Sequence, residues 1–440
     1  MASSQVWHVL GGGSLGLLCA FHLRTVGFAV NLILRSSSAV TAFKQSGSCV
    51  GLLESWRKDS VPSWRRSPPL QATSIPCIVN TASDNNSHVF CGEFLSKGLG
   101  ATRINRLIVA TKAQDTVLAL RNLLPYMDPG CRCILLQNGV LAVAEELQQT
   151  LGEQLGWTTR SPDLHPQGRA AMYADVAGIK DVAAGKMRLY VASVTHGCYR
   201  EAPPQQDIQR LPSDSLAFGL VHAGLGSITV GVLGPFLAST SAPLLTGKPS
   251  ITPEHSPPQR FDTVHGDDMA FLQDLAADLP DLNIHPEADS SVLLHGLLAK
   301  LAANCAINPL TVLLGCCNGT VTELPQTRGI ILDICRELIA IFGPTPFAPP
   351  GLKSGDRELA PLDCTKEESE KALYDWVLAV AAATANNRSS MLQDIAAGRA
   401  TEVDYLNGWV LRAAAARGLQ APVNATLHAL VKAREKLVAV

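Results

Sequence analysis

The sequence predicts an α/β domain built on a parallel sheet, followed by a domain made almost wholly of helices. In the first part of the chain, short apolar runs that are typical of buried strands alternate with helical segments, as in βαβ units. After Pro286, helical segments continue to the end of the chain. We therefore expect the first domain at residues 1–287 and the helical domain at residues 288–440.

The first predicted strand, Val6–Leu10, leads through a glycine-rich turn into a predicted helix, Leu17–Val26. Gly11 suits the tight turn, Gly13 lets a pyrophosphate approach the backbone, and Gly16 lets the helix pack closely against the strand. This order of elements predicts a Rossmann-type nucleotide-binding domain. The residues of the predicted phosphate loop are Gly11, Gly12, Gly13, Ser14, Leu15 and Gly16.

A second predicted strand, Ala29–Leu34, ends at Arg35. A site specific for NAD usually has an acidic residue at this point, where it binds the ribose hydroxyls, whereas arginine favours the 2′-phosphate of NADP. Ser36, Ser37 and Ser38 could add hydroxyl donors to that phosphate, or they could simply form a loop. We therefore predict NADP(H) as the cofactor.

Two further predicted strands, Arg106–Thr111 and Cys131–Leu136, are followed by Lys112 and by Asn138. Ligands of open parallel sheets bind at the carboxyl ends of the strands, so both side chains are candidates for binding cofactor or substrate. The alternatives are a solvated residue at a helix start for Lys112 and a plain Asn-Gly turn for Asn138.

The sheet is expected to continue through two strands and to end with a helix and one short strand. In chain order these are Arg188–Val194, Ser227–Leu233, the helix Asp267–Leu279 and the strand Leu282–His285. The segments between them are rich in Pro, Ser, Gly and Gln, and we interpret them as loop insertions. The predicted insertions are at about 55–70, 152–186, 199–214 and 237–261.

Composition limits the partners that the protein can have. A net charge of −2 gives no broad basic surface for nucleic acid or anionic membrane, and we expect no apolar span suited to a bilayer. The twelve cysteines have no CxxC or zinc-ligand spacing, and neither His196 nor His222 has one, so no metal site is predicted. We expect buried thiols in a reducing compartment, with a cytoplasmic location and a mitochondrial one as the alternative.

In the second domain, Lys300, Asn304 and Asn308 recur every four residues in an otherwise apolar predicted helix. They share one face, and one ammonium beside two amides resembles the lining of a polar pocket. The alternative is a polar surface stripe on a core helix. Ser390 and Glu402 also begin predicted helices, where a serine can act as a cap and a carboxylate can interact with the helix dipole.

Taken together, these segments resemble the ketopantoate reductases (2-dehydropantoate 2-reductases) over nearly the whole chain outside the insertions. The nucleotide-domain pattern of that family falls on Gly11, Gly13, Gly16, Arg35, Lys112 and Asn138, and its Thr-His-Ala turn appears as Thr195-His196-Gly197. The more specific motifs lie in the second domain: Lys300–Thr311, Cys317–Gly319, Ser389–Asp394 and Thr401–Gly408.

The resemblance implies NADPH-dependent reduction of 2-dehydropantoate to (R)-pantoate, a step toward pantothenate and coenzyme A. It also implies a second domain like the C-terminal domain of 6-phosphogluconate dehydrogenase. Lys300 would be the general acid, and Glu402 would contact the reacting region and the cofactor. The other implied cofactor contacts are Gly197, Lys112 and Asn138, and the implied substrate contacts are Asn138, Lys300, Asn304, Asn308, Asn318 and Ser390.

Two other functions share this domain plan. The chain could reduce another 2-oxo acid or a 6-phosphogluconate-type substrate, or it could be a noncatalytic protein that binds NADP. The presence of Lys300, Glu402 and the glycine loop together favours an enzyme with a small-molecule 2-oxo-acid substrate. The sequence does not fix the oligomeric state, although it is compatible with a homodimer.

Overall fold

A computed structural model describes residues 6–56, 64–74, 103–151, 187–200, 218–232, 266–343 and 365–438. The predicted insertions at 152–186 and 237–261 lie outside these ranges, as do 57–63 and 201–214 of the other two. Contacts divide the chain into two units. Unit 1 comprises Met1–Gln137, Val143–Val230 and Gly266–Pro286, and unit 2 comprises Asn138–Ala142, Gly231–His265 and Glu287–Val440.

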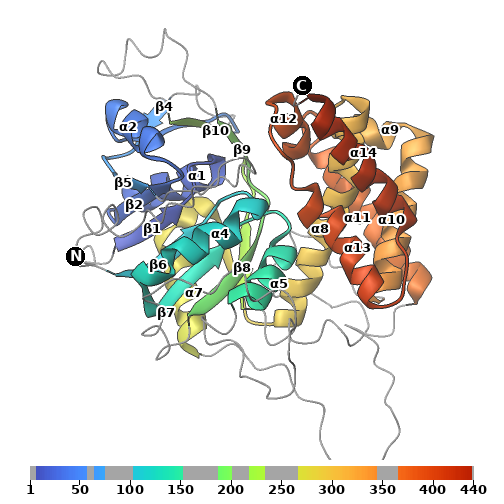
Figure 1. The fold of residues 1–440 in the computed structure, drawn as a ribbon, viewed down its shortest axis with the longest axis horizontal. Coiled ribbons are helices and arrows are strands. Elements are labelled where there is room, and N and C mark those ends of the chain that lie inside the picture. The colour runs from blue at the N-terminus through green and yellow to red at the C-terminus, as the bar shows by residue number, and fades with distance from the viewer. Residues whose placement is uncertain are drawn as a thin grey trace, which may run out of the picture. The chain divides into compact units, whose positions relative to one another are not determined.

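Unit 1 is built on an eight-stranded sheet with the order β12-β11-β8-β7-β6-β1-β2-β5 (Figure 1). From β5 to β8 each neighbouring pair is parallel, so the carboxyl ends of these strands meet at one edge. The strands are β1 (Val6–Leu10), β2 (Ala29–Leu34), β5 (Gln71–Ser74), β6 (Ile104–Val109), β7 (Met127–Leu135), β8 (Arg188–Val194), β11 (Ile228–Gly231) and β12 (Ile284–Glu287).

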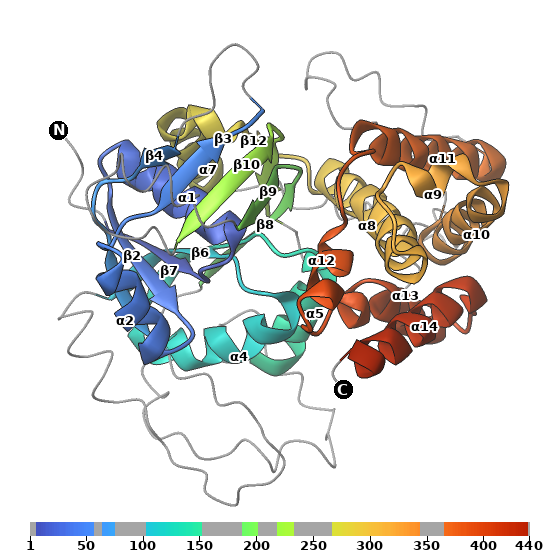
Figure 2. The same ribbon diagram turned by 90° about the horizontal axis from the view of Figure 1, so that it is seen from above.

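Helices cover both faces of this sheet. In Figure 2, α1 and α7 lie on one face, and α4 and α5 lie on the other. This arrangement explains why the central strands are apolar on both sides, as predicted. The helical elements of the domain are α1 (Ser14–Thr25), α2 (Ser37–Gln45), α4 (Ala113–Leu123), η1 (Leu124–Tyr126), α5 (Val140–Leu151), α7 (Gly266–Asp278) and η5 (Pro280–Leu282).

The predicted strand Leu282–His285 begins too early. Leu282 ends the 3-10 turn η5, and Asn283 has a positive φ of 45°, so the chain becomes extended only at Ile284. The left-handed residue lets the chain reverse between α7 and β12. Nothing in the apolar pattern marks this position, because Leu282 is buried in either conformation.

A second, four-stranded sheet was not predicted. Its order is β4-β3-β10-β9, with bounds β3 (Gly51–Glu54), β4 (Trp64–Arg66), β9 (Gly197–Arg200) and β10 (Gly219–Gly224). The interpretation of 55–70 and 199–214 as loops is therefore wrong for β4 and for the end of β9. Strand β4 pairs with β3, and Arg65 Nη1 lies 2.8 Å from Glu54 Oε2 across that pair. Such short strands depend on tertiary pairing, which leaves little periodic signal.

The serine run after β2 is not a loop. Ser36 is the N-cap of α2, and its hydroxyl oxygen accepts a hydrogen bond from the Ala39 backbone nitrogen at 3.2 Å. Ser37 and Ser38 form the first turn of the helix. Serine competes well for the first position of a helix because its hydroxyl bonds an otherwise unpaired N–H group.

In the described part of unit 2 after Glu287 the regular elements are all helical, as predicted (Figure 2). The longest, α8, is nearly all apolar and is buried along most of its length. By length and composition α8 could cross a membrane, which corrects our expectation that the chain has no such span, but burial within unit 2 is typical of a core helix. The helices are α8 (Ser290–Leu314), α9 (Thr320–Glu323), α10 (Pro325–Phe342), α11 (Lys366–Ala383), α12 (Ser390–Ala396), η6 (Val403–Tyr405), α13 (Asn407–Ala416) and α14 (Pro422–Val438).

A buried polar network fastens α8 to its neighbours. Pro309 lies inside α8 and has no N–H group, which leaves the Cys305 carbonyl without its helical donor. The Asn407 side chain donates to that carbonyl at 3.0 Å and to Asn424 Oδ1 at 2.9 Å. Asn424 in turn donates to Glu337 Oε2 at 2.7 Å. The network therefore joins α8, α13, α14 and α10 at the point where Pro309 interrupts the hydrogen bonds of α8.

Candidate active site

The glycine loop of unit 1 has the geometry of a phosphate cradle. Gly11 has φ of 112°, and a Cβ there would lie 2.7 Å from the Ala110 carbonyl oxygen. A Cβ at Gly16 would lie 2.0 Å from the Gly11 carbonyl oxygen. Gly13 is exposed and is the N-cap of α1, and a Cβ there would meet nothing closer than 3.8 Å. Half-buried Leu15 follows in the first turn. The open helix start fits the pyrophosphate of a dinucleotide.

The second sheet brings further side chains to this loop. Arg200 Nη1 donates to the Gly12 carbonyl oxygen at 3.5 Å, and a side-chain hydrogen bond joins Ser14 to Cys198. Burial raises the pKa of the Cys198 thiol to about 11. Gly197 begins β9 and packs against the backbone of β10. Sequence reasoning missed Arg200 and Cys198, because only the unpredicted sheet places them beside the loop.

A charged cluster lies where β2 ends and α4 begins. Arg35 is exposed directly after β2, and Lys112 is the half-buried N-cap of α4. Burial raises the pKa of the Asp115 carboxyl, and the charges of Arg35 and Lys112 oppose that rise. The structure therefore brings the two predicted cations together around one carboxylate. Sequence reasoning missed Asp115, because an acid in a first helical turn has an ordinary electrostatic explanation.

In unit 2, the charge of Glu402 acts on Lys300, which lies in the mostly apolar helix α8. Lys300 is half-buried in α8, and Glu402 precedes η6 with only 6% of its surface exposed. Burial lowers the pKa of Lys300 to about 8, and the charge of Glu402 acts in the opposite direction. Because the effect of burial is the larger of the two, the ammonium group is a readily available proton donor near neutral pH.

Asn304 and Asn308 occupy α8 one and two turns beyond Lys300, as the spacing predicted. Asn304 is half-buried and Asn308 is buried. No described residue hydrogen-bonds to either side-chain amide. These amides can therefore bind the polar groups of a ligand on the same face as the ammonium group.

The Ser389-Ser390 pair begins α12. Ser389 caps the helix, and its Oγ lies 2.6 Å from Thr311 Oγ1 in a buried contact that joins α12 to α8. Capping therefore belongs to Ser389, and half-buried Ser390 occupies the first turn.

Asn318 lies in the turn after α8. Its Nδ2 donates to Thr384 Oγ1 at 3.0 Å, whereas its buried Oδ1 has no hydrogen-bond partner among the described residues. A buried amide oxygen without a partner is costly, so this atom can accept a hydrogen bond from a ligand or from water.

Asn138, directly after β7, belongs to a short segment that groups with unit 2. Its Nδ2 donates to Glu402 Oε2 across 3.4 Å. Gly139 has φ of 66°, and a Cβ there would lie 2.6 Å from the Tyr405 carbonyl oxygen. The Asn-Gly pair is thus more than a plain turn, since it brings an amide to the buried carboxylate.

His196 has structural hydrogen bonds on both ring nitrogens. Its Nδ1 lies 3.0 Å from His222 Nε2, and its Nε2 lies 2.9 Å from the Leu282 carbonyl oxygen. A carbonyl can only accept, so we assign the proton of His196 to Nε2 and a donated proton to His222 Nε2. Within the described ranges, His, Cys, Asp and Glu side chains form no group of three that could hold a metal ion.

Comparison with known families gives matches in both halves of the chain. Residues 7–234 match the family described as ketopantoate reductase PanE/ApbA. Residues 293–435 match the family described as ketopantoate reductase PanE/ApbA C terminal.

Individual relatives agree with this result. A 2-dehydropantoate 2-reductase of Shigella flexneri is 39% identical over 169 residues, which are 38% of this chain and 47% of that protein. Such bacterial matches thus span about half of the relative's length. A probable 2-dehydropantoate 2-reductase of Schizosaccharomyces pombe is 26% identical over 436 residues, 97% of this chain and 95% of that protein.

The fold is also shared with a solved structure of D-mandelate dehydrogenase with NADH and anilino(oxo)acetate. That structure has a TM-score of 0.59 at 16% identity and covers 99% of this chain and 100% of its own. At this identity the likeness concerns the fold alone.

Proposed function

Because the chain belongs to the ketopantoate reductase PanE/ApbA family, we propose that it reduces 2-dehydropantoate to (R)-pantoate with NADPH. The observation that carries the proposal is the Lys300–Glu402 pair in the apolar surroundings of unit 2. In this apolar helix, the Lys300 ammonium group has a pKa of about 8, which suits it to donating a proton.

Lys300 is proposed as the general acid. When a ketone carbon accepts a hydride, negative charge develops on the carbonyl oxygen, and a cation within hydrogen-bond reach both stabilises that charge and supplies the proton. The Lys300 Nζ proton moves to the oxygen, which becomes the hydroxyl of the product, and the neutral amine regains a proton from solvent. Bound NADPH would supply the hydride.

The other polar groups of unit 2 are proposed to orient the substrate. Glu402 keeps the Lys300 ammonium charged, because its carboxylate raises the pKa that burial lowers. The amides of Asn304 and Asn308 and the Ser390 hydroxyl offer hydrogen bonds to the carboxylate and hydroxyl of ketopantoate. Asn318 Oδ1 can accept from a substrate hydroxyl. Fixing the substrate in this way is itself a large part of catalysis.

The residues of unit 1 are proposed to hold the cofactor. The glycine loop can bind the pyrophosphate through backbone N–H groups at the start of α1. Arg35 and Lys112 around Asp115 provide net positive charge suited to the 2′-phosphate, which favours NADPH over NADH. Arg200, beside Gly12, adds a guanidinium group near the loop.

The experiment is to follow NADPH absorbance with purified protein and ketopantoate, and with a panel of other 2-oxo acids that includes benzoylformate. We expect ketopantoate to have the highest kcat/KM. A higher kcat/KM with another member of the panel would support the proposed reductase activity but show that ketopantoate is not the preferred substrate. Tight NADPH binding without turnover of any 2-oxo acid would contradict the proposal and favour a noncatalytic NADP-binding protein.

A further inference from the structure

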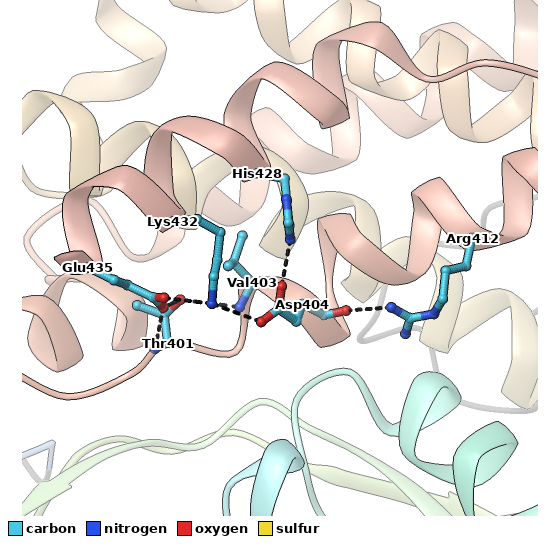
Figure 3. Close-up of polar contacts among 7 residues, drawn as sticks. All are labelled: Thr401, Val403, Asp404, Arg412, His428, Lys432 and Glu435. Atoms are coloured by element: carbon cyan, nitrogen blue, oxygen red, sulfur yellow. Dashed lines mark hydrogen bonds and ion pairs between the residues drawn. The ribbon is translucent and has the colours of Figure 1, made fainter. Parts of the chain in front are cut away.

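Glu402 lies in a turn whose amino-terminal side, at Thr401, is hydrogen-bonded to helix α14 (Figure 3). The backbone nitrogen and the hydroxyl of Thr401 both donate to Glu435 Oε1, at 2.7 Å and 2.6 Å. The Val403 backbone nitrogen donates to Thr401 Oγ1 at 3.3 Å. One carboxylate of α14 therefore fixes both the backbone and the side chain of the residue that precedes Glu402.

The carboxyl-terminal side of the turn is fastened through Asp404. Its carboxylate accepts from His428 Nε2 at 2.6 Å and from Lys432 Nζ at 2.9 Å, both on α14. Its carbonyl accepts from Arg412 Nη1 of α13 at 3.2 Å. Lys432 Nζ also lies 2.7 Å from Glu435 Oε2, so one ammonium group joins the two attachments.

These attachments fix Thr401, directly before Glu402, and Asp404, two residues after it. The Glu402 side chain is buried, and its backbone carbonyl accepts from the nitrogens of Tyr405 and Leu406, which close η6. A buried side chain has few rotamers available, so the place of its carboxylate depends on the place of its backbone.

We propose that Glu435, Lys432 and His428 of α14 are positioning residues, which hold the turn at Thr401–Asp404 so that the Glu402 carboxylate stays beside Lys300. The inference rests on the proposed function, because it assigns these residues to the proton donor of that reaction. None of the three is proposed to contact substrate or cofactor.

The charges around the turn suit this role. Hydrogen bonds and the charge of Lys432 lower the pKa of Asp404 and of Glu435 despite partial burial, and these two carboxylates raise the pKa of Lys432. The network is therefore charged near neutral pH. Among the described residues, His428 and Arg412 are further ionisable groups that bond to Asp404. Glu402 is the group in the turn whose charge acts on Lys300.

A purely structural role predicts a different outcome. Exposed ion pairs usually contribute about 0 to 1 kcal/mol to stability, and Asp404 and Lys432 are 47% and 36% exposed. If the network only stabilised the fold, its removal would change the melting temperature and leave the titration of Lys300 unchanged. If it positions Glu402, its removal lowers the pKa of Lys300, because the carboxylate that raises this pKa is displaced.

The test compares Glu435→Ala, which removes the acceptor of both Thr401 hydrogen bonds, with Glu435→Gln, which keeps an acceptor oxygen. Asp333→Asn is the matched control, because Asp333 and Arg336 form an i,i+3 ion pair on α10 like that of Lys432 and Glu435 on α14. Two readouts are recorded: the pH dependence of turnover, and the titration of Lys300 by ¹³C NMR of lysine-labelled protein, assigned with Lys300→Arg.

For Glu435→Ala we expect the alkaline limb of turnover and the NMR titration to move together to lower pH. Turnover at neutral pH should fall about 10- to 100-fold, the scale expected when a reacting group is displaced by a remote change. Glu435→Gln should recover part of both effects, and Asp333→Asn should show neither. If Glu435→Ala fails to fold, Lys432→Met removes the link between the two attachments and is expected to shift both readouts in the same direction.

An unmoved Lys300 titration in a folded Glu435→Ala or Lys432→Met protein would overturn the inference. Failure of the proposed function would look different, since wild-type protein would then turn over no 2-oxo acid. The NMR titration needs no turnover, so it decides the positioning role in either case.

Discussion

At the level of single residues, the cost of burying the Lys300 ammonium group is only partly compensated by the charge of Glu402. The folded protein lowers the pKa of Lys300 from 10.5 to about 8, so it favours the neutral amine relative to the unfolded chain. A charged Lys300 below that pH therefore opposes folding, so its presence in α8 agrees with the proposed role as a proton donor and not with a role in stability.

We therefore expect Lys300→Met to have opposite effects on activity and on stability. Turnover with ketopantoate should fall by about 10² to 10⁴-fold, the usual contribution of a general acid. The melting temperature at pH 7 should rise, because an apolar side chain of similar length replaces a desolvated ammonium group. A melting temperature below that of wild type would show that the ammonium group stabilises the fold, against the lowered pKa.

The pH dependence of wild-type turnover follows from the same group. Lys300 must be protonated to act as the acid, so turnover should be constant below pH 8 and should decrease above it, as the group loses its proton near a pKa of about 8. Steady-state rates between pH 6 and pH 10 at saturating substrate would measure this limb. A rate that rises through pH 9 would contradict the assignment.

Cofactor choice is also decided by individual side chains. Arg35→Asp places a third negative group beside a bound 2′-phosphate and Asp115, so the preference for NADPH over NADH should decrease by about 10- to 100-fold, the scale of a charge-assisted hydrogen bond. The ratio of kcat/KM for the two cofactors is the measurement. Retention of the full preference would mean that other residues recognise the phosphate.

Some of these residues could be found from the sequence and others could not. Lys300, Asn304 and Asn308 share a helix face, so their spacing was sufficient to group them. Glu402 was found through a resemblance, and the structure adds that it is buried. Asp115 lies near Arg35, and Arg200 near Gly12, because strand pairing and helix packing bring distant segments together. Such contacts cannot be predicted from local sequence.

At the level of secondary-structure elements, the large sheet could be predicted from local sequence, whereas the small sheet could not. The predicted strands Val6–Leu10, Ala29–Leu34 and Arg188–Val194 have the predicted bounds, because continuous apolar runs indicate strands that helices cover on both faces. The strands of the small sheet have three to six residues and alternate little, so they were interpreted as loops or left unassigned.

The internal proline of α8 leaves one backbone carbonyl, that of Cys305, dependent on a side-chain donor from outside the helix. Asn407→Ala removes the donor to the Cys305 carbonyl and leaves buried groups unpaired, so we expect a loss of about 1 to 3 kcal/mol in the free energy of unfolding. Gln393→Ala is the control, because its exposed amide also donates to a backbone carbonyl, that of Arg388. If both variants lose the same free energy of unfolding in urea, the buried network does not stabilise α8 more than an exposed hydrogen bond does.

At the scale of the whole molecule, the buried histidines of unit 1 predict sensitivity to acid. Burial lowers the pKa of His8, His22 and His222 from 6.5 to about 4. The folded state therefore binds fewer protons than the unfolded state between these values, and stability present above pH 6.5 is lost as the pH falls toward 4. Each histidine can contribute about 3 kcal/mol to this loss.

The measurement is the free energy of unfolding in urea at several pH values from 7.5 to 4.5. His22→Gln should reduce its slope with pH, because one group that titrates on unfolding has been removed. Equal slopes for wild type and His22→Gln would contradict the role of burial.

The most direct test of the whole account is a single-turnover experiment, in which protein saturated with NADPH is mixed with ketopantoate and cofactor fluorescence is followed in a stopped-flow instrument. We expect rapid ketopantoate-dependent oxidation by wild-type protein, and oxidation slower by about 10² to 10⁴-fold in Lys300→Ala with unchanged NADPH affinity. Oxidation at the same rate in both proteins would show that Lys300 is not the proton donor.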